Sequence, residues 1–515
     1  MRRMNNTKIC DCTLRDGGYY NQWDFSKSVV DEYIKAANNL PIDYIEVGYR
    51  NNPLKDYLGK YGYCPAFELT DIRNKSTKKV AVMIDEKNVG PADLINLIEP
   101  IKSLVDMVRI AVDPQNFDRA VILAEGIKKY GLQVGFNTMY MSKWQEYDGF
   151  FNKLAGINGV ADVFYMVDSF GGVSPAEVKE ILLIVKEKTT CAVGFHGHNN
   201  LEMGLINTVT AIDNGVDYVD ATVLGIGRGA GNLKLELLLT YLNKYYERDV
   251  DFNVLGDVIA VFSGLFERYK WGTNLPYMLS AANSFPQKDI MDWINTRAYS
   301  FNNIVRALDN RRLDRADNAK YPITKMPQFD KVIVVGGGSS AVLHADAVKA
   351  FINQNQSVAL IHATTRNAAY YNDLAIPQYY CLAGNEEKRL TTVFSNIPFN
   401  GKCILPPYPR KMGTDVPIFV QDATVELPYI EFTSQYLDSC TAVALQSAAL
   451  CCNNEIFLVG YDGYLGNILS EKEAVLTKEN NILFSSFINF YNKPLVSLTP
   501  SLYGELDVRS VYRYL

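Results

Sequence analysis

Residues 191–198 read Cys191-Ala192-Val193-Gly194-Phe195-His196-Gly197-His198, an apolar run that leads directly into two histidines. The apolar run predicts a buried strand, and side chains two residues apart in a strand point to the same face. His196 and His198 would therefore project together from the carboxyl end of that strand. Enzymes built on parallel sheets carry their chemistry at this end. The pair thus predicts a site for one metal ion.

A metal ion needs more than two ligands, and Asp16 is the best candidate for a third. It lies in Thr13-Leu14-Arg15-Asp16-Gly17-Gly18, where an apolar run near the start of the chain ends. One carboxylate and two imidazoles form a mixed oxygen and nitrogen set that leaves coordination positions open. Such a set suits Mn²⁺, Mg²⁺, Fe²⁺ or Zn²⁺, and the general affinity order of these ions does not choose among them.

The first half of the chain alternates apolar, strand-like runs with longer helical patterns. One helical pattern, residues 175–188, opens with Ser174 as N-cap and Pro175 at the first helical position. Continuous apolar strands separated by helices are typical of parallel sheets covered on both faces, so the fold class is α/β and the first domain, residues 1–231, is predicted to be a (β/α)₈ TIM barrel. The runs lie at residues 8–14, 43–50, 79–85, 107–112, 133–140, 163–169, 191–199 and 218–225.

The strand-like runs end on polar residues, which are difficult to explain as packing alone. In a barrel these ends converge on one mouth. For Asp85 and Asp220 a role in capping a loop is the alternative. The polar strand ends are Arg15, Asp16, Glu46, Asp85, Arg109, Asn137, Thr138, Asp168, Ser169, His196, His198, Asp220 and Thr222.

Three segments in this order resemble the DRE-TIM metallolyases, the superfamily of 4-hydroxy-2-oxovalerate aldolase, 3-hydroxy-3-methylglutaryl-CoA lyase and 2-isopropylmalate synthase. They are residues 13–17, residues 196–199 and the glycine-rich segment 225–232. The resemblance covers about the first half of the chain. It implies that Asp16, His196 and His198 are the protein ligands of a divalent metal, with Mn²⁺ or Mg²⁺ expected, and that Asn232 is a fourth ligand or lies beside the metal.

The implied reaction is the cleavage or formation of a carbon–carbon bond through a pyruvate-type enolate. Arg15 would donate to the enolate oxygen that the metal also stabilises, although a structural salt bridge to Glu46 is the alternative. Ser169 resembles the aldolase position that binds the pyruvate carboxylate. The resembling aldolases use a histidine shortly after the Arg-Asp pair as base, whereas this chain has Gly18-Tyr19-Tyr20-Asn21. Tyr19, Tyr20 and a metal-bound hydroxide are therefore the candidate bases.

Two other functions stay open at this stage. One is a Claisen-type synthase that uses an acyl-CoA, as isopropylmalate synthase does. The other is a bifunctional protein whose C-terminal domain binds a nucleotide-linked compound.

Residues 232–328 read as a helical extension and linker, with apolar helical periodicity at residues 233–246 and 254–269. In the aldolases that the first half resembles, a helical extension shields the mouth and can contact a partner. The resemblance therefore implies a homodimer, and an aldehyde dehydrogenase is a candidate partner.

A third segment, residues 329–515, is predicted to be a doubly wound, Rossmann-like α/β domain. The buried-strand run 331–335 is followed by Gly336-Gly337-Gly338-Ser339-Ser340-Ala341, and more strand-like runs follow at residues 357–362, 378–382, 455–460 and 495–499. The turn fits the pattern G-x-G-x-x-A, in which Gly336, Gly338 and Ala341 would let backbone N–H groups hold a phosphate.

The nucleotide in this third segment is an open question. A dinucleotide site has an acidic residue at the end of the second strand, but that strand ends in Ile361-His362-Ala363-Thr364. Three alternatives stay open for this segment: it binds NAD(P), it binds another nucleotide, sugar nucleotide or phosphate ligand, or its role is purely structural. Gly460-Tyr461-Asp462-Gly463, after another strand, is the next place where polar ligand contacts are expected.

Composition excludes several classes of protein. The 515 residues are 48% hydrophobic and 21% charged, with a net charge of -6, so no overall positive field favours nucleic acid. No stretch of 18 apolar residues without charge predicts a membrane span, and no signal peptide is expected. Nine scattered cysteines are typical of reduced thiols. We therefore expect a cytoplasmic enzyme with a small 2-oxo acid or aldehyde substrate.

Overall fold

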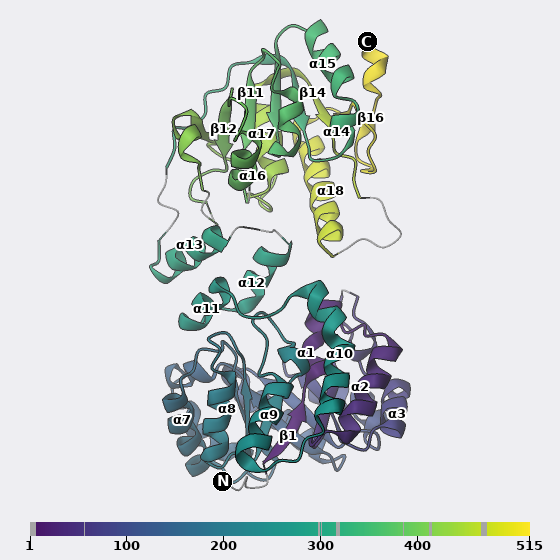
Figure 1. Ribbon diagram of the computed structural model, residues 1–515, viewed down its shortest axis with the longest axis vertical. Coiled ribbons are helices and arrows are strands. Elements are labelled where there is room, and N and C mark those ends of the chain that lie inside the picture. Colours follow the sequence, from purple (N-terminus) through teal and green to yellow (C-terminus); the bar gives the residue numbers. More distant parts are fainter. Residues whose placement is uncertain are drawn as a thin grey trace. The chain divides into compact units, whose positions relative to one another are not determined.

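The computed structural model describes residues 7–55, 57–296, 299, 301–315, 320–384, 386–410, 412, 415–464 and 471–515. Its contacts divide the chain into two compact units, Met1–Ile290 and Met291–Leu515, here called the barrel unit and the C-terminal unit (Figure 1). In the part of the chain that is described, no helix is long and apolar enough to cross a membrane.

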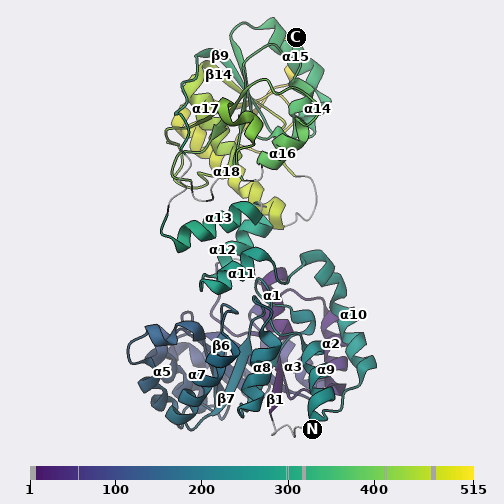
Figure 2. The same ribbon diagram turned by 60° about the vertical axis from the view of Figure 1, so that its left-hand side comes forward.

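The barrel unit is built on eight parallel strands that close on themselves, which confirms the TIM barrel. Each strand pairs with the next, and β8 returns to β1 through pairs such as Lys8 with Tyr218. Helices α7 and α8 lie outside β6 and β7 (Figure 2). The strands are β1 (Lys8–Asp11), β2 (Tyr44–Tyr49), β3 (Lys79–Asp85), β4 (Met107–Val112), β5 (Gln133–Thr138), β6 (Val163–Asp168), β7 (Ala192–Gly197) and β8 (Tyr218–Ala221).

Helices of the barrel unit follow the predicted alternation. Ser174 is the N-cap of α7, as predicted, and the structure adds a reciprocal pair of bonds between Ser174 and Glu177. The helices are α1 (Thr13–Asn21), α2 (Lys27–Asn39), α3 (Ala66–Lys75), α4 (Leu94–Leu97), α5 (Phe117–Lys128), α6 (Phe150–Lys153), α7 (Pro175–Lys188), α8 (Gly204–Asp213), α9 (Leu235–Tyr246), α10 (Phe252–Tyr269), α11 (Leu275–Ala282) and α12 (Gln287–Met291).

The first strand is shorter than predicted. It ends at Asp11 instead of residue 14, and α1 begins at Thr13. The cause lies at Asp11, whose carboxylate accepts hydrogen bonds from Thr13 N at 2.8 Å and from the Tyr33 hydroxyl at 2.7 Å. Arg15 and Asp16 therefore lie in the first turns of a helix at the barrel mouth, not on a strand.

Helices α9 and α10 belong to the same hydrophobic core as the barrel. Leu238, Leu239 and Leu242 of α9 are fully buried in it. Phe262 of α10 meets the rings of Phe25 and Tyr33 edge-on, at centroid distances of 6.5 and 5.9 Å. The predicted helical extension thus packs against the barrel from its first turn, while the boundaries at residues 231 and 328 stay predictions.

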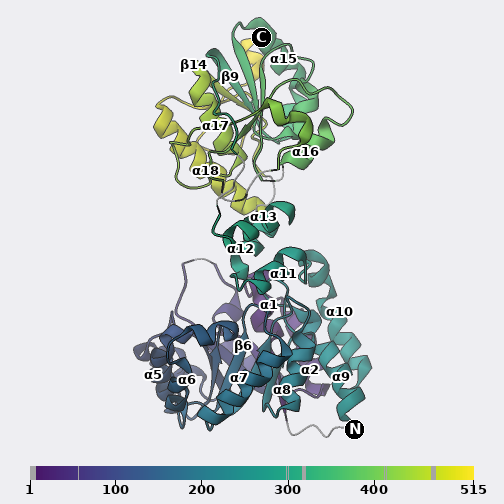
Figure 3. The same ribbon diagram turned by 90° about the vertical axis from the view of Figure 1, so that its left-hand side faces the viewer.

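The C-terminal unit contains one parallel sheet in the order β13-β12-β11-β10-β9-β14-β15-β16. Helices α17 and α18 lie on one face of β9 and β14, and α15 and α16 lie on the other (Figure 3). The sheet confirms a parallel α/β domain, and the Rossmann-like assignment stays a prediction. The strands are β9 (Phe329–Val335), β10 (Val358–His362), β11 (Gln378–Cys381), β12 (Lys402–Leu405), β13 (Thr424–Glu426), β14 (Cys452–Val459), β15 (Val496–Ser497) and β16 (Asp507–Val508).

Three of these strands, β12, β13 and β16, are absent from the sequence prediction. Each spans four residues or fewer, too short for an apolar pattern to show. The helices of the unit are α13 (Phe301–Arg312), α14 (Ser340–Leu343), α15 (Ala345–Gln354), α16 (Glu386–Val393), α17 (Cys440–Cys451) and α18 (Glu471–Tyr491).

Candidate active site

Four buried charged side chains alternate in sign beneath the barrel mouth. Arg15 Nε and Arg109 Nη1 both donate to Glu46 Oε2, at 2.8 and 3.1 Å, and Arg109 also pairs with Asp220. Burial raises the pKa of Glu46 and of Asp220, but the neighbouring arginines outweigh it, so that both pKa values fall below the usual range. Both carboxylates are therefore charged, and each buried charge has an opposite partner.

His196 is oriented by this charged network. Its Nδ1 lies 2.7 Å from Asp220 Oδ2. An ionised carboxylate only accepts hydrogen bonds, so Nδ1 carries a proton, and in the neutral imidazole the lone pair is therefore on Nε2. That Nε2 lies 3.8 Å from Asp16 Oδ2. The imidazole thus offers its lone pair toward the carboxylate predicted to share the metal.

His198 is oriented in the same way by a backbone group. Its Nδ1 donates to the Asp168 carbonyl oxygen at 2.8 Å, which again leaves Nε2 with the lone pair. Burial lowers the pKa of His198 well below its usual value, and the nearby His196 lowers it further. The two rings, with centroids 5.0 Å apart, both suit metal ligation.

Asp16 and Asn232 complete a set of oxygen donors. Asp16 Oδ1 pairs with Arg15 Nη1, and Asp16 Oδ2 accepts from Asn232 Nδ2 at 2.8 Å. Asn232 Nδ2 also donates to the Ile226 carbonyl, so two acceptors fix the amide orientation. Asn232 Oδ1 is left buried without a hydrogen-bond partner among the described residues. A buried unpaired oxygen is costly unless something else binds it.

These donors fit a divalent cation, although the metal itself stays a prediction. Ligand atoms of Cys12, Asp16 and His196 lie within 4.8 Å of one another. His198 belongs to no such three-residue group in the described part of the chain, but it lines the same cavity. The structure thus brings Asp16, His196 and Asn232 together and places His198 beside them.

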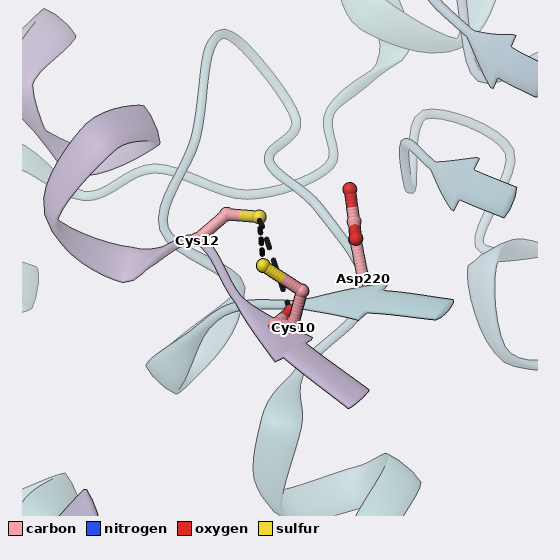
Figure 4. Close-up of side chains that lie close together, drawn as sticks. All are labelled: Cys10, Cys12 and Asp220. Atoms are coloured by element: carbon pink, nitrogen blue, oxygen red, sulfur yellow. Dashed lines mark hydrogen bonds between the residues drawn. The ribbon is translucent and has the colours of Figure 1, made fainter. Parts of the chain in front are cut away.

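A second cluster, formed by Cys10, Cys12 and Asp220, lies deeper in the barrel (Figure 4). The two sulfurs are 3.9 Å apart, and Arg109 Nη1 donates to both, at 3.7 Å to Cys10 and 3.2 Å to Cys12. Burial raises the pKa of Cys12 well above its usual value. Because a guanidinium already occupies the cluster, we assign it to the charged network and not to a second cation site.

A cavity of about 160 Å³ opens above the predicted metal site, and its lining contains most of the predicted site residues. Ser169 lies in it, and its Oγ accepts from Tyr140 N at 2.9 Å, so its own hydrogen is available to a ligand. The lining residues are Arg15, Asp16, Tyr19, Tyr49, Met83, Ala111, Asn137, Met139, Tyr140, Val167, Ser169, Phe170, His196, His198, Arg228, Pro286, Gln287 and Lys288.

The structure separates the two tyrosines that were candidate bases. Tyr19 lines the cavity, and its hydroxyl lies 2.7 Å from that of Tyr49. The Arg228 guanidinium carbon lies 4.0 Å from the centroid of the Tyr19 ring. Tyr20 instead donates to the Gly229 carbonyl at 3.2 Å, and burial raises its pKa far above the usual value. Tyr20 is therefore structural, and Tyr19 remains.

Sequence reasoning missed Tyr49, Arg228, Gln287 and Lys288 of this cavity. Tyr49 ends β2 and could have been found by its position at the carboxyl end of a strand. Arg228 lies inside the glycine-rich segment that was recognised for its glycines. No sequence signal marked Gln287 or Lys288, because they follow helix α11 and reach the mouth only through the folding of the chain.

The glycine turn of the C-terminal unit is occupied by a carboxylate of the protein itself. Asp462 Oδ2 accepts from Ser340 N at 2.9 Å and from Ser339 Oγ at 3.2 Å. A Cβ on Gly338 would lie 2.4 Å from Asp462 Oδ1, so only glycine permits this approach. A phosphate bound by Gly336, Gly338 and the turn before Ala341 would have to displace Asp462, and nucleotide binding there stays a prediction.

An acidic residue does reach the end of β10, but from elsewhere in the chain. Glu386 of α16 accepts from Thr365 N at 2.9 Å and from the hydroxyls of Thr364 and Thr365. It also pairs with Arg389. The carboxylate is thus engaged with the protein's own donors.

The chain is similar in sequence to a known family and to enzymes of known name. The family model described as HMGL-like matches residues 103–259. A 4-hydroxy-2-oxovalerate aldolase of Thermomicrobium roseum is 31% identical over 246 residues, which are 47% of this chain and 68% of the relative. The enzyme of that name from Pelotomaculum thermopropionicum is 30% identical over 285 residues, 54% of this chain and 82% of the relative.

Solved structures show the same fold. The N-terminal domain of a candidate aldolase from Bacteroides vulgatus is 62% identical, with a TM-score of 0.56, over 58% of this chain and 99% of that domain. Rhizobium etli pyruvate carboxylase matches at 15% identity and a TM-score of 0.50, over 59% of this chain and 33% of the carboxylase, a likeness of fold alone. All these matches cover about half of the chain.

Proposed function

This chain belongs to the HMGL-like family, within the DRE-TIM metallolyase superfamily, and from that premise we propose that it is a divalent-metal-dependent aldolase acting through a pyruvate-type enolate. The relatives named 4-hydroxy-2-oxovalerate aldolase support a carbon–carbon lyase. One observation carries the finer proposal: Asp16, His196 and Asn232 meet beside Arg15 at one end of the cavity. In the proposed reaction a 4-hydroxy-2-oxo acid is cleaved to pyruvate and an aldehyde, or the reverse.

Asp16, His196, His198 and Asn232 would hold the metal. A divalent ion supplies Lewis-acid chemistry, which stabilises negative charge on a keto oxygen as it becomes an enolate oxygen. Glu46, Asp16 and the buried surroundings hold the Arg15 guanidinium in place. A guanidinium has five N–H donors and two of them are used here, so Arg15 retains donors for that same oxygen.

Ser169 would bind the carboxylate of the 2-oxo acid. Its oxygen is fixed by the Tyr140 backbone N–H, and its hydroxyl hydrogen is left for the substrate. A hydrogen bond to a charged acceptor is stronger than one between neutral groups, which favours this role.

Tyr19 is our candidate for moving the proton. In cleavage the C4 hydroxyl loses its proton to Tyr19 in its phenolate form, the C3–C4 bond breaks, and its electron pair forms the enolate while the aldehyde leaves. Tyr19, now protonated, returns that proton to C3, which gives pyruvate and restores the phenolate. Arg228 over the Tyr19 ring and the Tyr49 hydroxyl would both stabilise a phenolate.

Exchange of the pyruvate methyl protons in D₂O, followed by NMR, tests this proposal. Metal-stripped full-length protein should be inactive, and Mn²⁺ or Mg²⁺ should restore exchange. Asp16→Asn should abolish it. Asp118→Asn, at an exposed carboxylate on α5, is the matched control and should retain it, since its side chain is 78% exposed. Absence of exchange in protein shown to bind metal would remove pyruvate as the donor and direct attention to an acyl-CoA.

A further inference from the structure

Two cations of the cavity lie at its exposed rim without a carboxylate partner. Arg228 and Lys288 line the cavity and are exposed, and neither forms an ion pair with a described residue. Asp16 is the only acid among the described lining residues, and it is already bonded to Arg15. Arg15 is further matched by Glu46. No carboxylate of the described residues thus neutralises these two cations: Lys288 is exposed, and the Arg228 guanidinium, which lies over the Tyr19 ring, has five N–H donors and can also bind a ligand.

The segments that carry these two cations are packed against each other. A Cβ on Gly229, next to Arg228, would lie 1.9 Å from the side-chain oxygen of Gln287, next to Lys288. Tyr20 holds the first segment through the Gly229 carbonyl, at 3.2 Å. Gln287 Nε2 holds the second by donating to Asn200 Oδ1, at 2.8 Å. The rim is thus a built surface and not two free side chains.

The cavity also offers apolar contacts. Met139, Val167, Phe170 and Pro286 belong to its lining. The 2-oxo acid would occupy the inner end, beside Asp16 and Arg15, so the acceptor aldehyde extends outward from the new C3–C4 bond. A short apolar aldehyde would offer these two cations no group to bind, whereas an anionic one would.

We propose that the acceptor is an aldehyde bearing an anionic group, a carboxylate or a phosphate, which Arg228 and Lys288 bind. This inference rests on the proposed aldolase function. In synthesis pyruvate C3 loses one proton and bonds to the aldehyde carbon, and the new C4 alkoxide takes one proton, so the product is the sum of its two reactants. The anionic group does not react.

Matched acceptors test the inference in the full-length, Mn²⁺-loaded protein. Succinic semialdehyde is compared with pentanal, and glyceraldehyde 3-phosphate with glyceraldehyde, by the kcat/KM of pyruvate addition. For at least one pair we expect the anionic member to be favoured by about tenfold or more, a ratio within the range that charged groups at a binding surface supply. The preferred pair then distinguishes a carboxylate from a phosphate. The ratio should fall as the salt concentration is raised from about 20 mM to about 500 mM, because salt screens exposed charges.

The variants Arg228→Gln and Lys288→Gln should each lower the anionic-to-neutral ratio, by about fivefold for an exposed charge pair. Because the ratio is taken within one variant, a general loss of activity cancels. Lys129→Gln, at an exposed lysine that caps α5, is the control and should leave the ratio unchanged. Circular dichroism should show all three variants folded.

The outcomes separate this inference from the proposed function. Methyl exchange with equal use of anionic and neutral acceptors would overturn the inference and leave the aldolase standing. A ratio unchanged by Arg228→Gln, with a raised KM for pyruvate, would assign Arg228 to the pyruvate carboxylate and also overturn it. Absence of both exchange and addition, with metal bound, would remove the proposed function and this inference with it.

Discussion

In the barrel mouth, Asn232 Oδ1 is buried without a described hydrogen-bond partner and His196 Nε2 faces only the Asp16 carboxylate. In the C-terminal sheet, by contrast, Asp462 fills the glycine turn that could have held a ligand. Buried histidines show the same contrast. His196 is held by the charged Asp220, but His362 bonds only the neutral side chain of Gln378 and stacks on Tyr380.

The contrast shows that burial of polar groups alone does not mark a reactive site. The barrel stabilises its buried charges in pairs and leaves Asn232 Oδ1 unsatisfied, which costs folding energy that the proposed cation would offset. The C-terminal sheet satisfies its turn donors internally and keeps its buried histidine neutral. We therefore place the chemistry in the barrel, and the following tests challenge that division.

The largest effect should come from matched histidine variants. His196→Gln should lower kcat/KM for pyruvate addition on the order of 10³-fold, because it removes a proposed metal ligand that Asp220 orients. His362→Gln should leave kcat/KM within about twofold, since a reaction in the barrel does not use it. Steady-state kinetics on both variants measures this. Equal losses of kcat/KM in the two variants would contradict the assignment of the chemistry to the barrel.

Acid should destabilise the C-terminal unit through His362. Burial lowers the pKa of His362 to about 4 from 6.5, so its stabilising contribution is complete above pH 6.5 and is lost as the pH falls toward 4. The loss is about 3 kcal/mol, at 1.36 kcal/mol per pKa unit. Urea unfolding at several pH values, read by a brief deuterium pulse over residues 358–381, measures it.

His362→Gln should remove this part of the pH dependence. His344→Gln, at a partly exposed histidine of the same unit, should retain it. An identical pH profile in wild type and His362→Gln would show that folding does not lower the pKa of His362.

The barrel unit should show the opposite sign at Asp11. Burial raises the pKa of Asp11 from 3.8 to about 6, so the folded state holds the proton more tightly than the unfolded state. Its contribution to barrel stability therefore falls as the pH rises from 3.8 to 6, by about 3 kcal/mol, and is constant above that range.

Asp11→Asn should remove this decrease of barrel stability with rising pH, and Asp118→Asn should not. The deuterium pulse is read over barrel peptides in the same urea series. A slope of the same sign in both units would contradict the contrast drawn between them.

A smaller effect is expected at Asp220, which acts through His196. Asp220→Asn should weaken Mn²⁺ binding about 10- to 100-fold, the range for residues that orient a ligating histidine. Calorimetric titration measures the affinity, with Asp118→Asn as control. The carboxylate-bearing Asp220→Glu should recover part of the affinity, whereas a purely structural role would predict equal affinities in all these proteins.

The smallest effect should be at the glycine turn. Asp462→Ala should lower the stability of the C-terminal unit by about 1 kcal/mol. This is the usual cost of removing a carboxylate that accepts hydrogen bonds from backbone and hydroxyl donors at the start of a helix. Thermal unfolding measures this, with Asp373→Ala, 68% exposed, as control. Pyruvate addition should be unchanged, and a large loss of it would connect the turn to catalysis.

Much of the barrel was predictable from local pattern. Eight apolar runs gave eight strands, and Ser174 with Pro175 gave the start of α7 to the residue. The end of β1 was not predictable, because Asp11 stops the strand through bonds to Thr13 and to Tyr33, the second of which is 22 positions away. The short strands β12, β13 and β16 are held by their neighbours in the sheet.

The residues of the candidate site likewise fall into those that local sequence predicts and those that only distant contacts identify. The spacing of His196 and His198 predicted that they share a site, and the motif around Asp16 predicted that it joins them. Asp220 as the partner of His196, Tyr49 as the partner of Tyr19, and Asp462 in the glycine turn could not, since each contact joins residues 24 to 122 positions apart. Lys288 likewise reaches the cavity only because Gln287 is bound to Asn200.

By itself the sequence determined the alternating strands and helices, the histidine pair and the family, because periodicity and short motifs act over a few residues. Only the tertiary structure decided which polar side-chain atoms have a hydrogen-bond partner within the protein and which do not. Closure of the barrel brings β1 beside β8 and aligns Asp16, His196 and Asn232, and the register of the C-terminal sheet places Asp462 in its glycine turn. Hydrogen-bond partners across such distances depend on strand register and packing, which no local pattern encodes.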